Sequence, residues 1–141
     1  MPLYLCRARE GAIDDAAKAE IAEDITRIHC DVTGAPRVFV NVFFFDVPGM
    51  GDDGGATAHL HGSIRAGRTS PQKDDLTSRM RAAIEQRSGV AGNAVETTIT
   101  DTPASWVMEG GEIFPEPGEE AAWLAKHGEK LGLKFGVSVT G

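Results

Sequence analysis

The sequence predicts an α/β (α+β) fold: two fused β-α-β units form a four-stranded sheet with two helices on one face, and a C-terminal extension follows. Two observations favour this fold. The order strand, helix, strand occurs twice, in residues 2–46 and 56–101, with an offset of about 55 residues. Each helix lies between two strands, and such a crossover implies a parallel strand pair. A ferredoxin-like sandwich shares this order of elements.

The first unit begins with a strand over Leu3–Arg9 and ends with a strand over Val38–Phe45, which is apolar on both faces. Between them, Asp14 or Asp15 can cap a helix, and Gly34 lies just past its end, where glycine is favoured. This helix has one apolar face, because its apolar residues recur at helical spacing: Ala17, Ile21, Ile25, Ile28 and Val32.

The second unit follows a loop rich in glycine and aspartate and begins with a strand over Thr57–Ile64. Ser70 is the expected N-cap of the second helix, and Pro71 is its first helical residue, a position that proline favours. The helix closes near Gly89, and a β-branched strand of period two follows over Val95–Thr100. The apolar stripe of this helix consists of Leu76, Met80, Ala83 and Ile84.

Residues 102–141 form an extension of different character, and we expect one single domain over residues 1–141. A short helix is predicted over Glu119–Lys126, with Trp123 as its apolar anchor. Beyond Gly132 the chain is either a final strand or a frayed end.

The composition is that of a small acidic globular protein, with a net charge of −7 and 41% apolar residues. This balance argues against a nucleic-acid or anionic-membrane surface, because both need a basic patch. No signal peptide and no apolar run of membrane-spanning length is apparent, so we expect a cytoplasmic protein. Cys6 and Cys30 are expected to be reduced core thiols. We expect no cofactor and no metal.

Pro2 is the first candidate for chemistry, because initiator Met1 is normally removed before a small residue such as proline. Removal leaves a secondary amine at the start of a strand, where the fold holds it in a fixed place. Burial and nearby cations lower the pKa of such an amine toward the working pH, which suits a general acid or base. A Met-Pro start by itself is more often without catalytic meaning.

Three basic residues indicate a carboxylate-binding site. Arg65 and Arg68 lie between the third strand and the second helix, where two guanidinium groups and a helix N-terminus favour an anion. His29 falls on the inward face of the first helix, in its last turn, where the helix dipole favours imidazolium. Taken singly, the arginines also fit a solvated turn, and the histidine also fits a satisfied core residue.

Glu109 is the candidate base for water, because the apolar Trp-Val-Met segment before it would raise the pKa of its carboxyl. An ordinary loop carboxylate is the alternative. His59 and His61 alternate in the third strand and share one face, but a metal site would need a third ligand, and the sequence suggests none.

Four segments together resemble the cis-3-chloroacrylic acid dehalogenase group of the tautomerase superfamily. They are Met-Pro-Leu-Tyr at the start, Ile-Thr-Arg-Ile-His-Cys-Asp-Val-Thr-Gly ending the first helix, His-Gly-Ser-Ile-Arg-Ala-Gly-Arg-Thr-Ser before the second helix, and Trp-Val-Met-Glu-Gly-Gly-Glu-Ile-Phe-Pro-Glu-Pro-Gly near the end. Each motif alone is weak, but all four occur in order at compatible spacings over residues 2–125.

The resemblance implies a tautomerase-like fold, assembly as a homotrimer, and a small carboxylic acid as substrate. Pro2 matches the family's amino-terminal proline, Glu109 matches the acid that activates water, and the residues that match the substrate-carboxylate site are His29, Arg65 and Arg68. In the dehalogenase chemistry the proline is a cation that protonates the carbon α to the carboxylate while water adds at the β carbon. In the tautomerase branch the proline is neutral and shuttles a proton between enol oxygen and carbon.

One position departs from the pattern: Thr98 stands where the dehalogenase has a tyrosine that assists water activation. A threonine hydroxyl is shorter and a far weaker acid, which argues against efficient dehalogenation. The resemblance therefore favours an enzyme that tautomerises or hydrates a small 2-oxo or α,β-unsaturated carboxylic acid through Pro2. A cis-3-haloacrylate hydrolytic dehalogenase and a non-catalytic binding or signalling module of the same fold are the alternatives.

Overall fold

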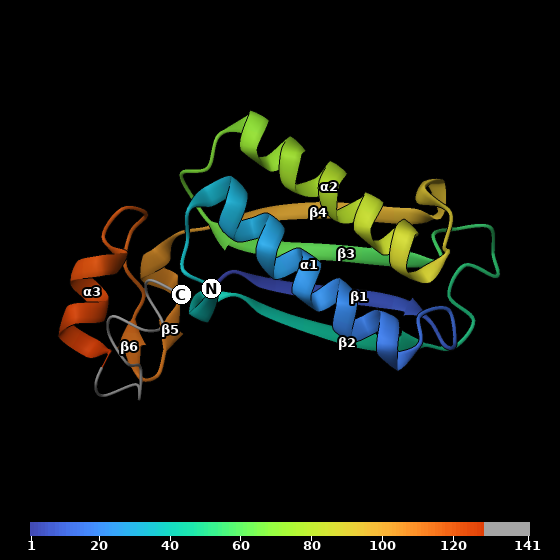
Figure 1. The fold of residues 1–141 in the computed structure, drawn as a ribbon, viewed down its shortest axis with the longest axis horizontal. Coiled ribbons are helices and arrows are strands. Elements are labelled where there is room, and N and C mark those ends of the chain that lie inside the picture. Colours follow the sequence, from blue (N-terminus) through green and yellow to red (C-terminus); the bar gives the residue numbers. More distant parts are fainter. Residues whose placement is uncertain (129–141) are drawn as a thin grey trace.

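The computed structural model describes residues 1–128 and contains the predicted four-stranded sheet (Figure 1). The strands lie in the order β2-β1-β3-β4. They are β1 (Leu3–Arg9), β2 (Asn41–Val47), β3 (Ala58–Arg65) and β4 (Val95–Thr102). β1 pairs in parallel with β2 and β3 in parallel with β4, while the central pair, β1 and β3, is antiparallel. Each parallel pair belongs to one β-α-β unit, so the predicted duplication is confirmed.

The two long helices, α1 (Asp15–Thr33) and α2 (Ser70–Ser88), pack side by side on one face of the sheet (Figure 1). Asp14 caps α1, because its carboxylate accepts a hydrogen bond of 2.8 Å from the amide of Ala17. Gly34 ends α1 in the left-handed conformation with a φ of 76°, which residues with a side chain rarely adopt. Both ends of the first helix are therefore as predicted.

The start of α2 differs by one residue from the prediction. Thr69, and not Ser70, is the N-cap: its hydroxyl accepts from the Gln72 amide at 3.2 Å, and the Gln72 side chain accepts from the Thr69 amide at 2.9 Å. This reciprocal capping box satisfies two backbone amides at once, whereas a cap at Ser70 would place a lysine at the partner position. Ser70 is therefore the first helical residue and Pro71 the second.

The second strand begins later than predicted. Residues Arg37–Phe39 form a 3-10 helix, and β2 starts only at Asn41. The reason is that Phe39, which is 2% exposed, packs toward the C-terminal extension and does not continue the sheet. β3 is shifted by one residue, and β4 runs two residues further than predicted because its last residue, Thr102, pairs with the last residue of β3, Arg65.

The main core lies between the sheet and the two helices. Burying one Leu or Ile side chain contributes about 1.5–3 kcal/mol, so this layer is the main source of stability. Both cysteines are free thiols; Cys6 is buried in this core, whereas Cys30 is only partly buried and so departs from the prediction. The largest fully buried side chains of the core include Tyr4, Ile21, Ile25, Ile64, Leu76, Met80 and Ile84.

The extension lies beyond the end of the sheet at which the N-terminus is found (Figure 1). It contains a hairpin of two short strands, β5 (Met108–Glu109) and β6 (Glu112–Ile113), and the helix α3 (Glu120–His127). α3 begins and ends one residue later than predicted. The sequence does not predict the hairpin, because two-residue strands are too short to show a periodic pattern. The alternatives for the chain beyond Gly132 lie outside the described residues.

A second apolar cluster joins the extension to the N-terminus. Trp123 anchors α3 as predicted, and its indole N–H donates a hydrogen bond of 2.7 Å to the carbonyl of Ile113. The rings of Phe39 and Phe114 meet edge to face with their centres 4.6 Å apart. This end cluster consists of Met1, Phe39, Phe114, Trp123 and Leu124.

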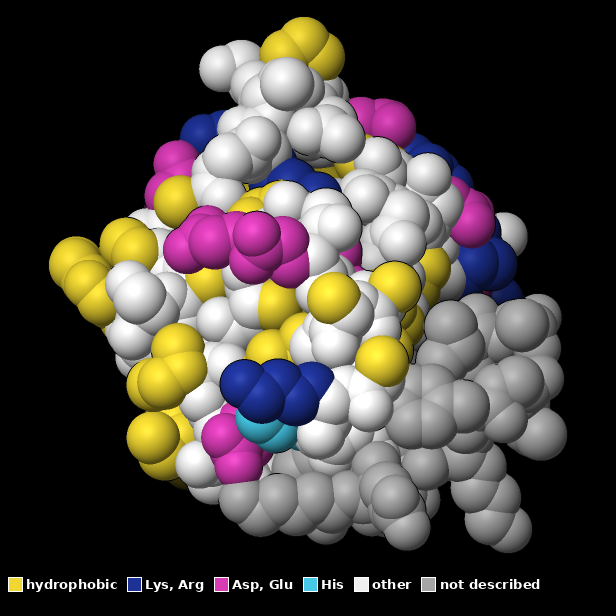
Figure 2. Space-filling model, turned by 90° about the vertical axis from the view of Figure 1, so that its left-hand side faces the viewer, with side chains coloured by type: hydrophobic (Ala, Val, Ile, Leu, Met, Phe, Trp, Pro, Cys, Tyr) yellow, Lys and Arg dark blue, Asp and Glu magenta, His cyan; other side chains and the backbone are white. Residues whose placement is uncertain are grey.

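The second face of the sheet carries no helix among residues 1–128. Phe43 and Phe45 of the edge strand β2 are 54% and 46% exposed on it. Hydrophobic side chains also gather along one flank of the end that the extension covers (Figure 2), and Trp106 and Met108 of the extension are exposed. Apolar patches of this kind are typical of surfaces that another subunit covers. None of the described helices is long and apolar enough to cross a membrane.

Candidate active site

All of the predicted site residues except Thr98 lie near the place where the amino terminus meets the extension. Pro2 is buried at the start of β1, and its carbonyl accepts a hydrogen bond of 3.0 Å from the amide of Asn41 on β2. The terminal amine of Met1 donates to the Phe39 carbonyl at 2.8 Å and contacts the Glu109 carboxylate directly. The amino terminus and Glu109 are therefore neighbours, as the catalytic roles predicted for Pro2 and Glu109 require.

In this chain the nitrogen of Pro2 belongs to the peptide bond with Met1, so the free amine is that of Met1. Met1 is 6% exposed and lies in the end cluster. Burial and the nearby Arg65 guanidinium lower the pKa of this amine to about 5, whereas the contact with Glu109 favours the charged amine. The surroundings thus suit a nitrogen that takes up and releases a proton.

His29 and Tyr4 form a buried pair beside this amine. The Tyr4 hydroxyl lies 2.7 Å from Nδ1 of His29, which is 1% exposed. Burial raises the pKa of Tyr4 well above its ordinary value, so the phenol keeps its proton, and we assign to His29 the tautomer in which the Tyr4 hydroxyl donates to Nδ1. The proton of a neutral His29 is then on Nε2, which is buried and has no hydrogen-bond partner among the described residues.

The helix dipole, which favours an imidazolium at His29, is opposed by burial of the ring. Burial, with smaller contributions from the positive charges of Arg68, Arg65 and the N-terminal amine, lowers the pKa of His29 to about 3. The helix dipole stabilises a cation by at most about 2 kcal/mol, which is less than the cost of removing a charged ring from water. His29 is therefore a neutral hydrogen-bond donor, and the same charges show that both arginines lie near it.

Gly62 makes room for the pair of Tyr4 and His29. It lies opposite Tyr4 in the antiparallel pairing of β1 and β3. A Cβ atom at position 62 would lie 2.6 Å from Cε1 of the Tyr4 ring, a distance that folded proteins do not show. Any side chain at this position would therefore push the Tyr4 ring away from His29.

Arg65 is the most deeply buried arginine of the site, at 2% exposed, and ends β3. Its guanidinium donates to the carbonyl of Pro115 at 2.7 Å and to Oε1 of Glu120 at 2.5 Å. The guanidinium carbon also lies 4.9 Å from the centre of the Phe114 ring. All three partners come from the extension, so the extension closes over this arginine.

Arg68 is far less well satisfied than Arg65. One guanidinium nitrogen makes a long hydrogen bond of 3.5 Å to the carbonyl of Thr33 at the end of α1. Its Nε is buried and has no partner among the described residues. Burial and the neighbouring Arg65 lower the pKa of Arg68. Because buried donors are nearly always satisfied in folded proteins, Nε of Arg68 and Nε2 of His29 favour an acceptor such as a carboxylate at this point.

Thr98 is not brought to this site within the chain. It lies on β4, on the face of the sheet that carries no helix, where its hydroxyl is 2.8 Å from Nε2 of His59 and 2.7 Å from Nδ1 of His61. These histidines share one face as predicted. Among residues 1–128, no three His, Cys, Asp or Glu side chains come together in a way that could hold a metal ion.

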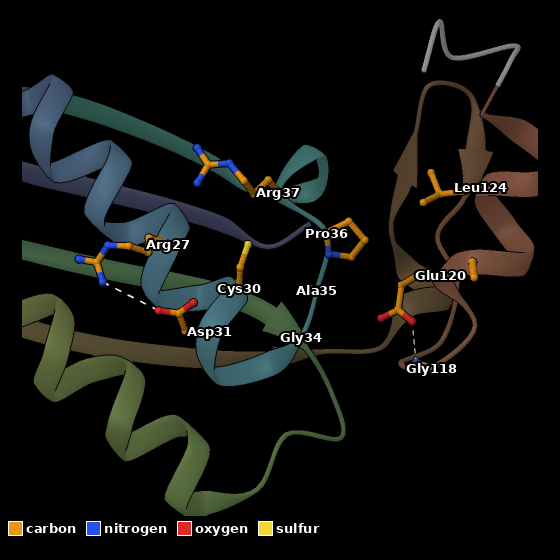
Figure 3. Close-up of a pocket in the computed structure, with 11 residues that line it drawn as sticks. Arg27, Cys30, Asp31, Gly34, Ala35, Pro36, Arg37, Gly118, Glu120 and Leu124 are labelled. Atoms are coloured by element: carbon orange, nitrogen blue, oxygen red, sulfur yellow. Dashed lines mark hydrogen bonds and ion pairs between the residues drawn. The ribbon is translucent and has the colours of Figure 1, made fainter. Parts of the chain in front are cut away.

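A cleft of about 490 Å³ lies beside the site, between the C-terminal end of α1 and the extension (Figure 3). Glu120 projects into the space between these two parts, and its Oε2 accepts a hydrogen bond of 2.8 Å from the Gly118 amide. The cleft is lined on one side by Cys30, Pro36 and Arg37 and on the other by Gly118, Glu120 and Leu124.

Comparison with protein families gives a match over residues 1–128 to the family described as "Putative oxalocrotonate tautomerase enzyme". The chain belongs to this tautomerase family. N1, a member of the cis-3-chloroacrylic acid dehalogenase (cis-CaaD) family, has a TM-score of 0.79 and 27% identity, over 93% of this chain and 99% of that chain. No curated protein matches the sequence.

Two further solved structures are similar to this chain over most of their own length. Ps01740 has a TM-score of 0.70 and 33% identity, over 76% of this chain and 99% of that chain. A fused 4-OT has a TM-score of 0.70 and 25% identity, over 79% of this chain and 94% of that chain. The tautomerase fold and superfamily predicted from the four motifs are therefore confirmed.

Sequence reasoning missed two residues of the site. Tyr4 is the one tyrosine of the chain, and the alternation of β1 places it on the buried side of the strand with Cys6, so strand periodicity could have found it. Glu120 gives no such signal. Its pairing with Arg65 depends on how the extension folds back over the end of β3, which is a contact between residues 55 positions apart.

Proposed function

We propose that this chain is an amino-terminal-proline enzyme that transfers protons on a small 2-oxo or α,β-unsaturated carboxylic acid. One observation carries the proposal: buried donors of His29 and Arg68 lack partners near Arg65, close to the amino terminus. Such a cluster selects an anion, and the planar guanidinium groups suit a carboxylate. Membership of the tautomerase family supports a tautomerase or hydratase reaction.

Removal of Met1 would give Pro2 the free amine of the site. The Met1 side chain fills apolar space beside Phe39 and Phe114, so its removal would also open room for a substrate next to Pro2. Burial and Arg65, which lower the pKa of the Met1 amine, would act on the amine of Pro2 in the same direction. A secondary amine that is partly neutral near pH 7 is a suitable general base.

In tautomerisation, the neutral nitrogen of Pro2 takes the proton from the enol oxygen. The oxygen becomes a carbonyl as the electrons of the carbon–carbon double bond take a proton back from the Pro2 ammonium at the neighbouring carbon. The substrate gains and loses one proton, so no other reactant is needed. His29, Arg65 and Arg68 would hold the carboxylate and stabilise the negative charge that develops on the enolate.

Hydration requires the amine of Pro2 to be charged at the start, whereas tautomerisation requires it to be neutral. Glu109 would take a proton from water as the water oxygen bonds to the β carbon, and the charged amine of Pro2 would protonate the α carbon. The Glu109 side chain is 27% exposed and contacts the terminal amine, which supports a position near both water and the amine. Hydration therefore requires Glu109, whereas tautomerisation requires only the carboxylate-binding residues and Pro2.

A cis-3-haloacrylate hydrolytic dehalogenase is the second candidate, and the similarity to N1 favours it. Water would add at the carbon that bears the halogen, and halide would then leave. Thr98, which stands at the position of the assisting tyrosine, has its hydroxyl engaged by His59 and His61. We therefore propose that tautomerase activity exceeds dehalogenase activity.

We also propose that the chain assembles as a homotrimer. The exposed Phe43 and Phe45 on the free face of the sheet support burial against another copy. Two fused 4-OT proteins with the same fold and 23% identity are trimers, which is consistent with this assembly.

A spectrophotometric screen of the untagged protein tests the proposed function, with the intact mass showing that Met1 is removed. We expect turnover of enol 2-oxo acids and weak or no release of halide from chloroacrylic acids. Glu109→Gln should abolish hydration and leave much of the tautomerase activity, whereas Glu116→Gln, at an exposed position, should change neither.

Three results would contradict parts of this proposal. Equal loss of both reactions in Glu109→Gln would refute the division of labour. A kcat/KM for dehalogenation near the diffusional range of about 10⁸–10⁹ M⁻¹s⁻¹ would show that the chain is a haloacrylate dehalogenase first and a tautomerase second. Carboxylate binding without turnover of any of these acids would favour the non-catalytic binding module.

A further inference from the structure

Arg65 already binds a carboxylate in this structure. Its guanidinium donates to Oε1 of Glu120 at 2.5 Å, and at 2% exposed it has almost no contact with water. The second oxygen of Glu120 accepts from the Gly118 amide at 2.8 Å, so both carboxylate oxygens are engaged. Burial alone would raise the pKa of Glu120, but the hydrogen bond from Arg65 holds this pKa below its ordinary value. Glu120 is therefore an ionised carboxylate in a position suited to a substrate carboxylate.

The remaining donors of the site are not satisfied by Glu120. Nε2 of His29 and Nε of Arg68 are both buried and have no partner among residues 1–128. Glu120 thus satisfies Arg65 but leaves two donors of the same basic cluster unpaired. A ligand carboxylate placed among all three basic residues would satisfy more donors than Glu120 does, which favours an exchange of one carboxylate for the other.

We propose that Glu120 is an internal carboxylate that occupies Arg65 in the ligand-free protein, and that the substrate carboxylate displaces it together with the start of α3. The inference rests on the proposed function, because it takes Arg65 as part of the carboxylate-binding site. The exchange keeps the charge beside the buried guanidinium constant, since one carboxylate leaves as another enters. This avoids the large cost of a buried cation without a partner.

The surroundings of Glu120 give it room to move. It lines the cleft of about 490 Å³ between the end of α1 and the extension, so its carboxylate can leave Arg65 without entering the main core (Figure 3). α3 spans only eight residues and is held to the rest of the chain by the end cluster. Displacement of this short helix leaves the sheet and its two long helices intact.

The exchange makes Glu120 a determinant of specificity. A neutral ligand cannot displace it, because Arg65 would lose its buried anion and gain none. An anionic ligand must compete with a carboxylate that is attached to the chain and therefore present at a high local concentration. The apparent dissociation constant for any carboxylate is then the intrinsic constant divided by the fraction of protein in which Arg65 is released.

The test measures binding of propionate, and of its neutral counterpart propionamide, by calorimetry in the wild type, Glu120→Gln and Glu119→Gln. Glu119 is the matched control, because it precedes Glu120, is exposed and makes no capping hydrogen bond. We expect Glu120→Gln to bind propionate on the order of tenfold more tightly, as removal of the internal competitor predicts. Glu119→Gln should match the wild type, and propionamide should bind to none of the three.

Hydrogen exchange provides a second readout, because a purely structural role of Glu120 predicts no change in the wild type when propionate is added. Propionate should increase amide exchange in residues 115–127 of the wild type and leave residues 58–65 of β3 unchanged. In Glu120→Gln the exchange of residues 115–127 should already be raised without propionate. If Glu120→Gln is too unstable to study, Glu120→Asp, which shortens the reach of the carboxylate, should give an intermediate affinity.

The outcomes separate this proposal from the proposed function. Unchanged or weaker propionate binding in Glu120→Gln, or no propionate-dependent rise in exchange of residues 115–127 in the wild type, would overturn the exchange of carboxylates. If propionate binds as described but no enol 2-oxo acid is turned over, the proposed reaction is wrong and the role of Glu120 stands. If no form of the protein binds propionate, the carboxylate-binding site itself is wrong, and both proposals fall.

Discussion

The β-α-β body and the C-terminal extension contribute different kinds of group to the site. The body supplies the amino terminus and the three basic residues, fixed by the sheet and by two capped helices of 19 residues each. The extension supplies two carboxylates, Glu109 and Glu120, on a two-residue strand and at the start of an eight-residue helix. The donors for a ligand therefore lie in the part of the chain that packs on the main core, and the acids lie in a part held by the small end cluster.

This difference suggests a division between binding and control. Groups that must hold a carboxylate in one place gain from a large core that fixes their position. Groups that must exchange partners, such as Glu120, or take up and release a proton, such as Glu109, gain from a smaller apolar cluster that allows them to move.

Arg68→Ala should cause a large loss of activity with little change in stability. Loss of one partner of a desolvated charge pair costs about 2–5 kcal/mol, which corresponds to a drop in kcat/KM of roughly 30-fold to several thousand-fold. Its melting temperature should stay near that of the wild type, because Arg68 has only one long hydrogen bond within the described chain. Steady-state kinetics on an enol 2-oxo acid and a thermal melt check both points.

Arg65→Ala should lose as much activity and, in addition, destabilise the extension. The change leaves Glu120 partly buried without its cation and removes the hydrogen bond to the carbonyl of Pro115. Normal kinetics in both arginine variants would show that the pair belongs to an ordinary turn.

A matched pair of substitutions compares the main core with the end cluster. Leu76 in α2 and Leu124 in α3 are 0% and 1% exposed. Leu76→Ala should lower the free energy of global unfolding by about 2–5 kcal/mol, as a cavity in a well-packed core predicts. Leu124→Ala should have its main effect on local opening of the extension.

Denaturant unfolding and native-state hydrogen exchange distinguish the two effects. After Leu124→Ala, exchange should rise in residues 108–127 and stay unchanged in α2. An equal loss of global stability in both variants would mean that body and extension unfold as one unit, which would weaken the proposed displacement of α3.

The smallest expected effect is a dependence of stability on pH that comes from His29. Its folded-state pKa of about 3 lies below the ordinary value of 6.5, so between these two values the unfolded chain binds a proton that the folded chain does not. Stability should therefore be complete above pH 6.5 and fall as the pH drops toward 3, with a slope of at most about 1.4 kcal/mol per pH unit.

Unfolding measured between pH 7 and pH 4 checks this slope. His29→Gln, whose side-chain oxygen can still accept from the Tyr4 hydroxyl, should lack it, while His59→Gln on the free face of the sheet should keep it. The same slope in His29→Gln and the wild type would show that His29 is protonated in the folded chain.

The body could be predicted from the sequence because its determinants are local. Apolar residues at helical spacing, a capping Asp14 or Asp15 and a glycine past the helix end define α1 to within one residue, and β-branched segments define the strands of the sheet. The errors in the body are shifts of one to three residues at element ends. They arise where a tertiary contact overrides the pattern, as when Phe39 leaves the sheet for the end cluster.

The electrostatic state of the site could not be predicted in the same way. The position of His29 in the last turn of a helix indicates a cation, but burial and two arginines from another segment make it neutral. The sequence suggests that Arg65 is a free anion-binding residue. In the structure it is paired with Glu120, because the extension folds back over the end of β3. Local patterns place the side chains, whereas charge and pairing depend on neighbours that are distant in sequence.

The most direct test of the central claim is the turnover of an enol 2-oxo acid by Pro2→Ala, with Pro48→Ala, at an exposed position, as the control. Intact mass must first show that Met1 is absent from all three proteins. We predict that kcat/KM falls by about 10²–10⁴-fold in Pro2→Ala, the usual contribution of a general acid or base, and stays at the wild-type value in Pro48→Ala. Wild-type turnover by Pro2→Ala would contradict the account, because the amine of Pro2 would then play no part in proton transfer.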